Sequence, residues 1–148
     1  MSTDFQFNEV ELVRVAKSWV GTPFHANSNE RGPRGGVSCH FLVTEIYKEC
    51  GFVIPDVPFG APGHARFSSQ SIIEPILDAN ANFARMTAPP KVGNLLGFRI
   101  GKIIHHLAIL LPNFQIVHAV SGVGVMINPY EDPTWKKRHV ATWRPLQK

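Results

Sequence analysis

The spacing of apolar residues changes near residue 95, and this change restricts the possible folds more than any other feature of the sequence. Upstream, apolar residues recur every three or four positions, which is the spacing of an amphipathic helix. Downstream, short β-type runs alternate with turns: LLGFRI, HHLAILL, QIVHAV, GVMI and HVATWRP. Helices that come first and strands that follow predict an α+β domain, with an antiparallel sheet packed on the helices.

The first predicted helix begins after Asn8. Asn8 is a favourable N-cap residue, and Glu11 stands three positions later, as in a capping box. Gly21 is expected to end the helix. We expect the buried face of this helix to be formed by Val10, Val13, Ala16, Trp19 and Val20.

A second helix is predicted after the segment 21–36, which is rich in Gly and Pro and therefore predicts a long loop. Ser38 can cap this helix, and Gly51 ends it. Its apolar face consists of Leu42, Val43, Ile46, Tyr47 and Cys50. Farther along, FVIPDVPFGAPGH predicts an irregular segment, and SSQSIIEPILDA predicts a short helix opened by a serine.

The two cysteines fall at opposite ends of the second helix. Eleven residues of helix would separate Cys39 from Cys50 by about 16 Å. A disulfide needs Cα atoms within about 7 Å, so we expect two free thiols. Cys39 lies in the first turn, where the helix dipole is expected to lower the pKa of its thiol. Burial is expected to raise the pKa of Cys50. Cys39 is therefore the candidate nucleophile and Cys50 a core residue.

A base for this nucleophile is available in the strands. The turn at 112–114 predicts a hairpin in which Leu111 pairs with Gln115. With that register, His106 and His118 lie diagonally on the same face, about 7–8 Å apart at the backbone. A two-residue turn would place them on opposite faces. His105 is expected to point into the other face. A zinc site made by the same cysteine and histidines is a competing hypothesis, ranked lower because no local metal-binding spacing accompanies it.

Length and charge exclude several classes of protein. A chain of 148 residues fits one domain, and no apolar run is long enough to span a membrane. The N-terminal segment MSTDFQFNEVEL lacks the basic and apolar regions of a secretory signal. The net charge of +4 is divided among ERGPRGG, FRIGK and WKKRH, which favours a solvated surface over a nucleic-acid groove.

Taken in order, these motifs resemble the NlpC-type cell-wall cysteine peptidases, compact papain-like proteins, and most closely their phage-borne branch. The segment AKSWVGTPFHANSNERGPRGGVSCHFLVTEIYKECG is similar to the family's opening helix, Gly-Thr-Pro-aromatic loop and cysteine helix. VGNLLGFRI resembles its Pro-Gly-Asp-Leu strand. The closing segment, from HHLAILL through QIVHAV to TWRP, resembles the last strands of the phage branch. The resemblance covers nearly the whole chain.

The resemblance implies Cys39 as nucleophile, His106 as general base and His118 as the residue that orients His106. It also implies hydrolysis of an amide in peptidoglycan stem peptides, commonly between D-glutamate and diaminopimelate, without a metal or organic cofactor. Positions beside the nucleophile depart from the family: Ser38 replaces an aspartate, His40 a small residue, and Phe24 a frequent tyrosine. We expect these three residues to line the substrate site.

Two other functions remain open at this stage. A wall-binding or phage-tail structural module would keep the fold without turnover, and a thiol acyltransferase would use the same cysteine. From the resemblance and the composition we expect one monomeric domain over residues 1–148, synthesised in the cytoplasm and delivered to the cell envelope in or from a phage particle. Its expected partners are peptidoglycan peptides and phage tail proteins, with no nucleic acid and no membrane insertion.

Overall fold

The computed structural model describes residues 3–26, 28–52, 54 and 73–147. The helices are α1 (Glu9–Trp19), α2 (Cys39–Glu49), α4 (Ile73–Ala79) and α5 (Pro133–Lys136). The short strands are β1 (Thr3–Asp4), β2 (Asn29–Glu30), β3 (Gly36–Val37) and β4 (Phe83–Met86). The longer strands are β5 (Leu95–Ile100), β6 (Ile103–Leu111), β7 (Gln115–Val120), β8 (Gly124–Pro129) and β9 (His139–Gln147). Within these ranges, no helix is long and apolar enough to cross a lipid bilayer.

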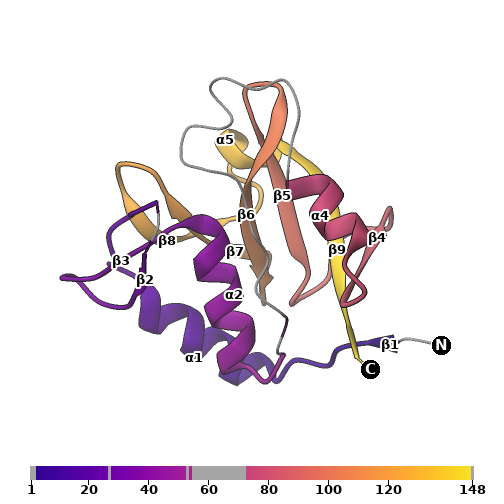
Figure 1. Ribbon diagram of the computed structural model, residues 1–148, viewed down its shortest axis with the longest axis horizontal. Coiled ribbons are helices and arrows are strands. Elements are labelled where there is room, and N and C mark those ends of the chain that lie inside the picture. Colours follow the sequence, from indigo (N-terminus) through magenta and orange to yellow (C-terminus); the bar gives the residue numbers. More distant parts are fainter. Residues whose placement is uncertain (1–2, 27, 53, 55–72, 148) are drawn as a thin grey trace.

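The predicted α+β architecture is confirmed, with an antiparallel sheet at its centre (Figure 1). The strand order is β1-β9-β5-β6-β7-β8, and β4 also pairs with β9. All five predicted strand segments lie in β5 to β9, whereas β1 and β4 were not predicted. Because β1 pairs with β9, the two ends of the described chain lie side by side.

Helix α1 begins as predicted and buries Ala16 and Trp19 as predicted, but the rest of its buried face differs. The side chain of Asn8 accepts a hydrogen bond from the Glu11 N–H at 2.9 Å, which satisfies one of the free donors of the first turn. The buried residues are Leu12, Val15, Ala16 and Trp19. Val10 is 81% exposed and Val20 is 49% exposed, so the predicted face was wrong at these positions, and Val13 is only partly buried. The true face has a complete i, i+3, i+4, i+7 spacing of its own, and it includes the large indole of Trp19.

Helix α2 follows the prediction closely. The Ser38 hydroxyl accepts a hydrogen bond from the Phe41 N–H, and Gly51 has the left-handed φ of +87° that ends the helix. The predicted residues Leu42, Val43, Ile46 and Tyr47 are all buried, and Cys50 packs partly buried against them. The Tyr47 hydroxyl donates a hydrogen bond to the Gly93 carbonyl at 2.8 Å, which ties α2 to the segment before β5.

The other regions predicted from the first half of the chain are only partly described. The predicted loop at 21–36 contains β2 and β3, which pair with each other in a small separate sheet. Helix α4 lies within the predicted short helix and contains Pro75 in its first turn. The serines expected to open that helix, and nearly all of the proline-rich segment before it, lie outside the described residues.

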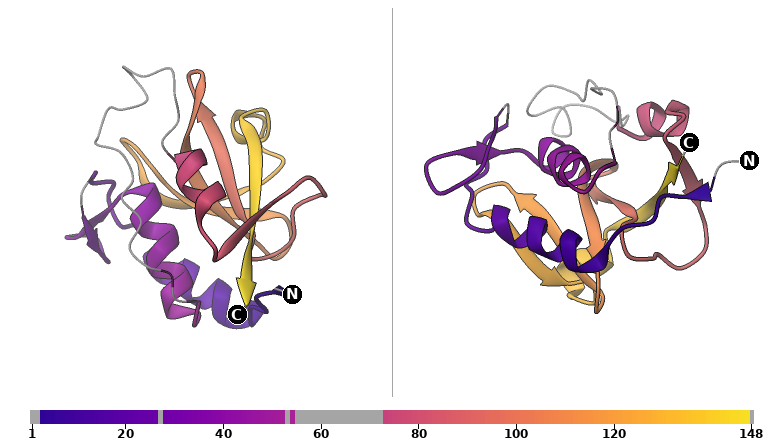
Figure 2. Two further views of the ribbon diagram at one scale, coloured as in Figure 1. Left: turned by 45° about the vertical axis from the view of Figure 1, so that its right-hand side comes forward. Right: turned by 90° about the horizontal axis from the view of Figure 1, so that it is seen from below.

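The central strands are covered differently on their two sides. Helices α1 and α2 lie together and pack on β6 and β7, and we call this side the helix face (Figure 2). Its core includes Leu107, Ile109, Val117 and Ala119. The opposite side carries a smaller cluster of Leu96, Phe98, Ala108, Leu110 and Ile116, against which Trp135 of α5 packs. We call it the α5 face.

Candidate active site

The β6–β7 hairpin sets the geometry of the site. Leu111 pairs with Gln115, as predicted from a three-residue turn, and Ile109 pairs with Val117. Asn113 and Phe114 both have positive φ, of 65° and 51°, which allows the tight connection. The pairing of the two strands ends at Ile109 and Val117, although both strands continue beyond these residues. The strands therefore part where they carry the predicted catalytic histidines.

The two predicted histidines meet on the α5 face. The Nε2 atom of His106 lies 2.8 Å from the Nδ1 atom of His118, and the ring centroids are 5.0 Å apart. Both side chains are buried, with 4% of His106 and none of His118 exposed. The predicted placement on a shared face is confirmed, because the three-residue turn gives both residues the parity that points them to the same side.

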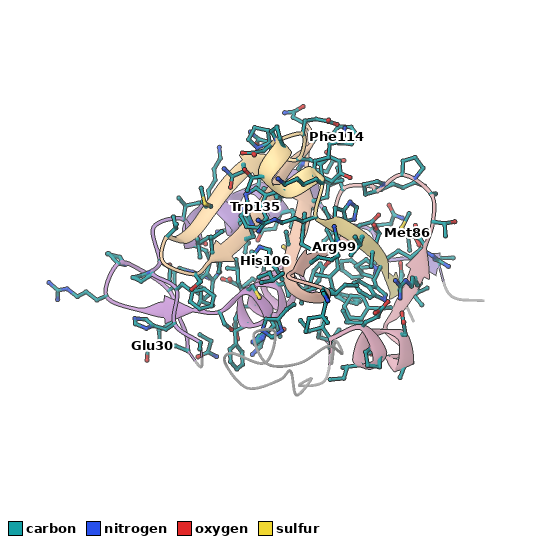
Figure 3. The ribbon with its side chains drawn as sticks, turned by 90° about the horizontal axis from the view of Figure 1, so that it is seen from above. Glu30, Met86, Arg99, His106, Phe114 and Trp135 are labelled. Atoms are coloured by element: carbon teal, nitrogen blue, oxygen red, sulfur yellow. The ribbon has the colours of Figure 1, made fainter. Side chains whose placement is uncertain are left out.

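Two residues that the sequence did not identify complete the surroundings of this pair. The Nε2 atom of His118 lies 2.7 Å from the Oδ1 atom of Asn128 on β8. The indole of Trp135 stacks on His106 at 5.0 Å and meets His118 edge-on at 4.6 Å (Figure 3). Signals for both were available: Asn128 is a polar residue in the apolar run GVMINP, and Asp132 followed by Pro133 is a typical helix start.

Cys39 approaches from the helix face. It is the first residue of α2, and its thiol lies 3.8 Å from the His105 carbonyl oxygen, to which it can donate a hydrogen bond. The ladder explains why this carbonyl is available. Leu110 exchanges backbone hydrogen bonds with the segment before β5, so by alternation the backbone groups of Leu107 face the β7 side. His105 lies at the register shift between β5 and β6, and its carbonyl faces the start of α2. Because β7 has already separated there, the start of α2 takes its place beside β6.

The pKa of Cys39 differs from the sequence-based expectation. Backbone N–H groups of Leu107, His40 and Cys39 itself lower it, as expected for a sulfur at a helix start, but burial outweighs them and raises the pKa to about 11. The residue as a whole is 8% exposed. The expectation of a lowered pKa was therefore wrong for the resting protein, because the sequence could not reveal how deeply the sulfur lies. Cys50 also has a pKa raised to about 11, mainly by burial, as predicted.

Burial acts on the histidines in the opposite direction. It holds the pKa of His106 well below its ordinary value, and the neighbouring His118 adds to this effect. The pKa of His118 is also lowered by burial, although the Asn128 side chain and the Asp132 carboxylate favour its protonated form. At neutral pH the resting site therefore contains a neutral thiol and two neutral imidazoles.

The three predicted substrate-site residues lie near the start of α2. Ser38 is 2% exposed and serves as the helix cap. Phe24 is partly buried and forms an isolated parallel bridge with Val37, next to that cap. His40 is half-buried, and burial lowers its pKa to about 4, with His105 as a second cause. Their role toward a substrate stays a prediction.

The geometry does not support the zinc hypothesis. Within the described ranges, no three or more His, Cys, Asp or Glu side chains are grouped so that they could hold a metal ion. Cys39, His106 and His118 are all described, and the two imidazoles bind each other. The second free thiol, Cys50, lies at the far end of α2.

Comparison with known proteins gives a match over most of the chain. The sequence model of the NlpC/P60 family matches residues 9–144. A curated relative, murein DD-endopeptidase MepS/murein LD-carboxypeptidase of Escherichia coli K12, is 38% identical over 58 residues. That alignment covers 39% of this chain and 31% of the relative, so the aligned part is about a third of the relative's length.

Solved structures share the fold at low sequence identity. An NLP/P60 family protein from Staphylococcus aureus, described as similar to a lipoprotein, superposes with a TM-score of 0.66 at 17% identity. The match covers 99% of this chain and 44% of that one. The peptidoglycan hydrolase RipB from Mycobacterium tuberculosis gives a TM-score of 0.57 at 21% identity, over 91% of this chain and 62% of its own. At such identities the likeness concerns the fold.

Proposed function

This chain belongs to the NlpC/P60 family, and on that basis we propose that it is a peptidoglycan hydrolase that uses Cys39 as nucleophile. The observation that carries the proposal is the 2.8 Å contact between the Nε2 atom of His106 and the Nδ1 atom of His118. The Cys39 sulfur contacts the residue next to His106 on the same strand, at the His105 carbonyl. A nucleophile, a base and a group that orients the base are the parts that covalent hydrolysis requires.

The resting protonation states define the first step. Because burial favours the neutral forms of both Cys39 and His106, the attack on the substrate carbonyl and the transfer of the thiol proton to His106 occur together. We propose that the Cys39 sulfur and the His106 imidazole approach each other at the gap where the pairing of β6 and β7 ends. The carbonyl carbon gains a bond to sulfur, and its oxygen takes the negative charge.

Backbone N–H groups at the start of α2 are placed to stabilise that oxygen. The N–H groups of Cys39 and His40 already lower the pKa of the thiol, so they favour negative charge at this position. His106, now protonated, gives its proton to the leaving amine. Water then attacks the thioester, returns its proton to Cys39 through His106, and releases the carboxylate product.

We further propose that the bond cut is the amide between D-glutamate and diaminopimelate. The test is digestion of purified peptidoglycan by the full chain, followed by mass spectrometry of the released muropeptides. The wild-type protein and Cys50→Ala should release the same fragments, because Cys50 lies at the far end of α2 from the histidines. Cys39→Ala and His106→Ala should each lower the rate on the order of 10⁴-fold.

The outcomes separate the bond from the activity. Cleavage of a DD bond, as in the name of the E. coli relative, would overturn the bond assignment but not the proposal that the protein is a peptidoglycan hydrolase. A wild-type protein that releases no fragment, or a Cys39→Ala variant that works as well, would contradict hydrolysis by this thiol.

A wall-binding module without turnover is the second candidate. The observation in its favour is the deep burial of the Cys39 thiol together with its raised pKa, which is also what a structural cysteine would have. Such a module would co-sediment with peptidoglycan, and Cys39→Ala would bind equally well. The same digestion therefore distinguishes the two functions.

A further inference from the structure

Two hydrogen bonds link Asn128 on β8 to His118 on β7 and His118 to His106 on β6. Asn128 determines which atom donates in each of them. The Oδ1 atom of an asparagine can only accept, so the Nε2 atom of His118 must carry the proton of their 2.7 Å contact. A neutral His118 then has a bare Nδ1, which accepts from the Nε2–H of His106 at 2.8 Å. A neutral His106 with its proton on Nε2 has a bare Nδ1.

The packing around the pair protects this arrangement. The indole of Trp135 covers the face of His106 and the edge of His118, and both rings are buried, so water competes little for their nitrogens. Asn128 stands on β8 opposite Ile116, two residues beyond the partner of His118, which is the diagonal position from which a side chain reaches across.

We propose that Asn128 is a positioning residue, whose amide oxygen fixes the tautomers of His118 and His106 and so leaves the Nδ1 atom of His106 as the base for Cys39. The base assignment rests on the proposed function, but the tautomers can be observed without turnover. The reverse amide orientation would place a donor against His118, reverse both bonds and put a proton on the Nδ1 atom of His106, where it would block the base.

The tautomers can be read directly by long-range ¹H–¹⁵N correlation NMR of the histidine-labelled full chain at neutral pH. The wild-type protein should show His106 and His118 each protonated at Nε2 alone. In Asn128→Ala the acceptor is lost, so both rings should become mixtures of tautomers. A wild-type His106 protonated at Nδ1, or an Asn128→Ala spectrum with unchanged tautomers, would overturn the proposal.

Tyr130→Phe is the matched control. The Tyr130 hydroxyl lies 2.7 Å from the Nδ1 atom of His139, a comparable hydrogen bond to a histidine on the same face of the sheet. Its loss removes a partly buried hydrogen bond and leaves the hydrogen bonds from Asn128 to His106 in place. Tyr130→Phe should leave the tautomers of His106 and His118 unchanged, whereas a change equal to that of Asn128→Ala would reveal a general loosening of the face and overturn the proposal.

Activity gives a second readout. Asn128→Ala should lower kcat/KM for muropeptide hydrolysis about tenfold. In Asn128→Asp, a carboxylate accepts from the Nε2 atom of His118 and stabilises a second proton on its Nδ1. That proton is donated to the Nε2 atom of His106, so the proton of a neutral His106 moves to Nδ1 and blocks the base. Activity should therefore be low at neutral pH and recover as the pH rises. The other charged or titratable groups around the pair are His40, His105, Asp132 and Arg138, and all of them remain in each variant.

The pH profile is the result that a merely structural role would not produce. An acid limb that moves to higher pH in Asn128→Asp, but not in Asn128→Ala or Tyr130→Phe, supports the proposal. An equal loss in Asn128→Asp and Asn128→Ala without a shifted limb would overturn it. If Cys39→Ala hydrolyses as well as the wild type, the proposed function fails, but the NMR result still decides whether Asn128 sets the tautomers.

Discussion

The helix face and the α5 face of the sheet treat polar groups in different ways. On the helix face, α1 and α2 cover an almost wholly apolar core, and the Cys39 sulfur lies 3.8 Å from the His105 carbonyl oxygen of β6. The α5 face is smaller and carries three hydrogen-bonded histidines, of which His106 and His118 are buried and His139 is half-buried. The nucleophile and its proposed base thus arrive from opposite sides, and burial keeps both neutral.

We infer from this difference that the site does not hold a thiolate–imidazolium pair at rest. A desolvated thiol and a desolvated imidazole both favour their uncharged forms, so charge develops only when a substrate is present to receive it. The family resemblance indicated Cys39, His106 and His118, and the division between the two faces constrains how these residues could work together.

Alkylation of Cys39 tests this division with the largest expected effect. Because its pKa is raised to about 11, its rate with iodoacetamide should rise on the order of a thousandfold between pH 7 and pH 10. His106→Ala should give the same curve, since the resting thiol does not depend on the imidazole. Peptide mass spectrometry would follow Cys39, with Cys50 as an internal reference.

The contrary result is easily recognised. If Cys39 of the wild type reacts with a midpoint below the ordinary thiol pKa of about 8.5, and His106→Ala removes that reactivity, then the two faces form an ion pair at rest. The contrast drawn between them would then be wrong.

Trp135→Ala should sharpen the comparison on the α5 face. Removal of the stacked indole would admit water to the His106–His118 pair and weaken the desolvation that lowers both pKa values. We expect kcat/KM to fall about tenfold and the acid limb of its pH profile to move toward higher pH. Trp135→Phe keeps an aromatic ring over His106 and should lie between this variant and the wild type. An acid limb unchanged in Trp135→Ala would mean that the indole does not exclude water.

Stability against acid should show the smallest effect. The pKa values of His106 and His118 are lower in the folded protein than in the unfolded chain, where they are near 6.5. As the pH falls below 6.5, these histidines bind protons in the unfolded chain before they do in the folded protein, so the free energy of unfolding decreases. The expected loss is at most about 1.4 kcal/mol per histidine per pH unit, measured by urea denaturation at pH 7 and pH 5.

Variants on the two faces separate this effect from general destabilisation. His118→Gln removes one buried titrating group, so the free energy of unfolding should depend less steeply on pH. This holds even if the variant is less stable than the wild type at pH 7. Cys39→Ala removes no group that titrates in this range and should leave the slope as it is. Equal slopes in His118→Gln and the wild type would show that His118 does not contribute to the acid sensitivity.

Much of the strand half of the protein could be predicted, because its register depends on local turn chemistry. The three-residue turn at 112–114 fixed the parity of His106 and His118, and with it their contact. The cap residues Asn8 and Ser38 likewise predicted the starts of both helices. These features depend on a few neighbouring residues, and the sequence displays them directly.

What could not be predicted depends on contacts between distant segments. The buried face of α1 is selected by the strands against which it packs, and two apolar stripes were available to choose from. The pKa of Cys39 depends on its burial against β6, sixty-six residues away along the chain. The contacts of Asn128 and Trp135 with the histidines form only when the fold brings β8 and α5 beside them, so the sequence did not reveal these contacts.

The early parting of β6 and β7 has a consequence for the catalytic cycle. In the free protein, the sulfur fills the place of a missing ladder neighbour, since its S–H can donate to the His105 oxygen. A thioester has no S–H to give, so each round of acylation would release that oxygen and each deacylation would recapture it. The His105 carbonyl of β6 would therefore lose and regain this hydrogen bond once in every catalytic cycle.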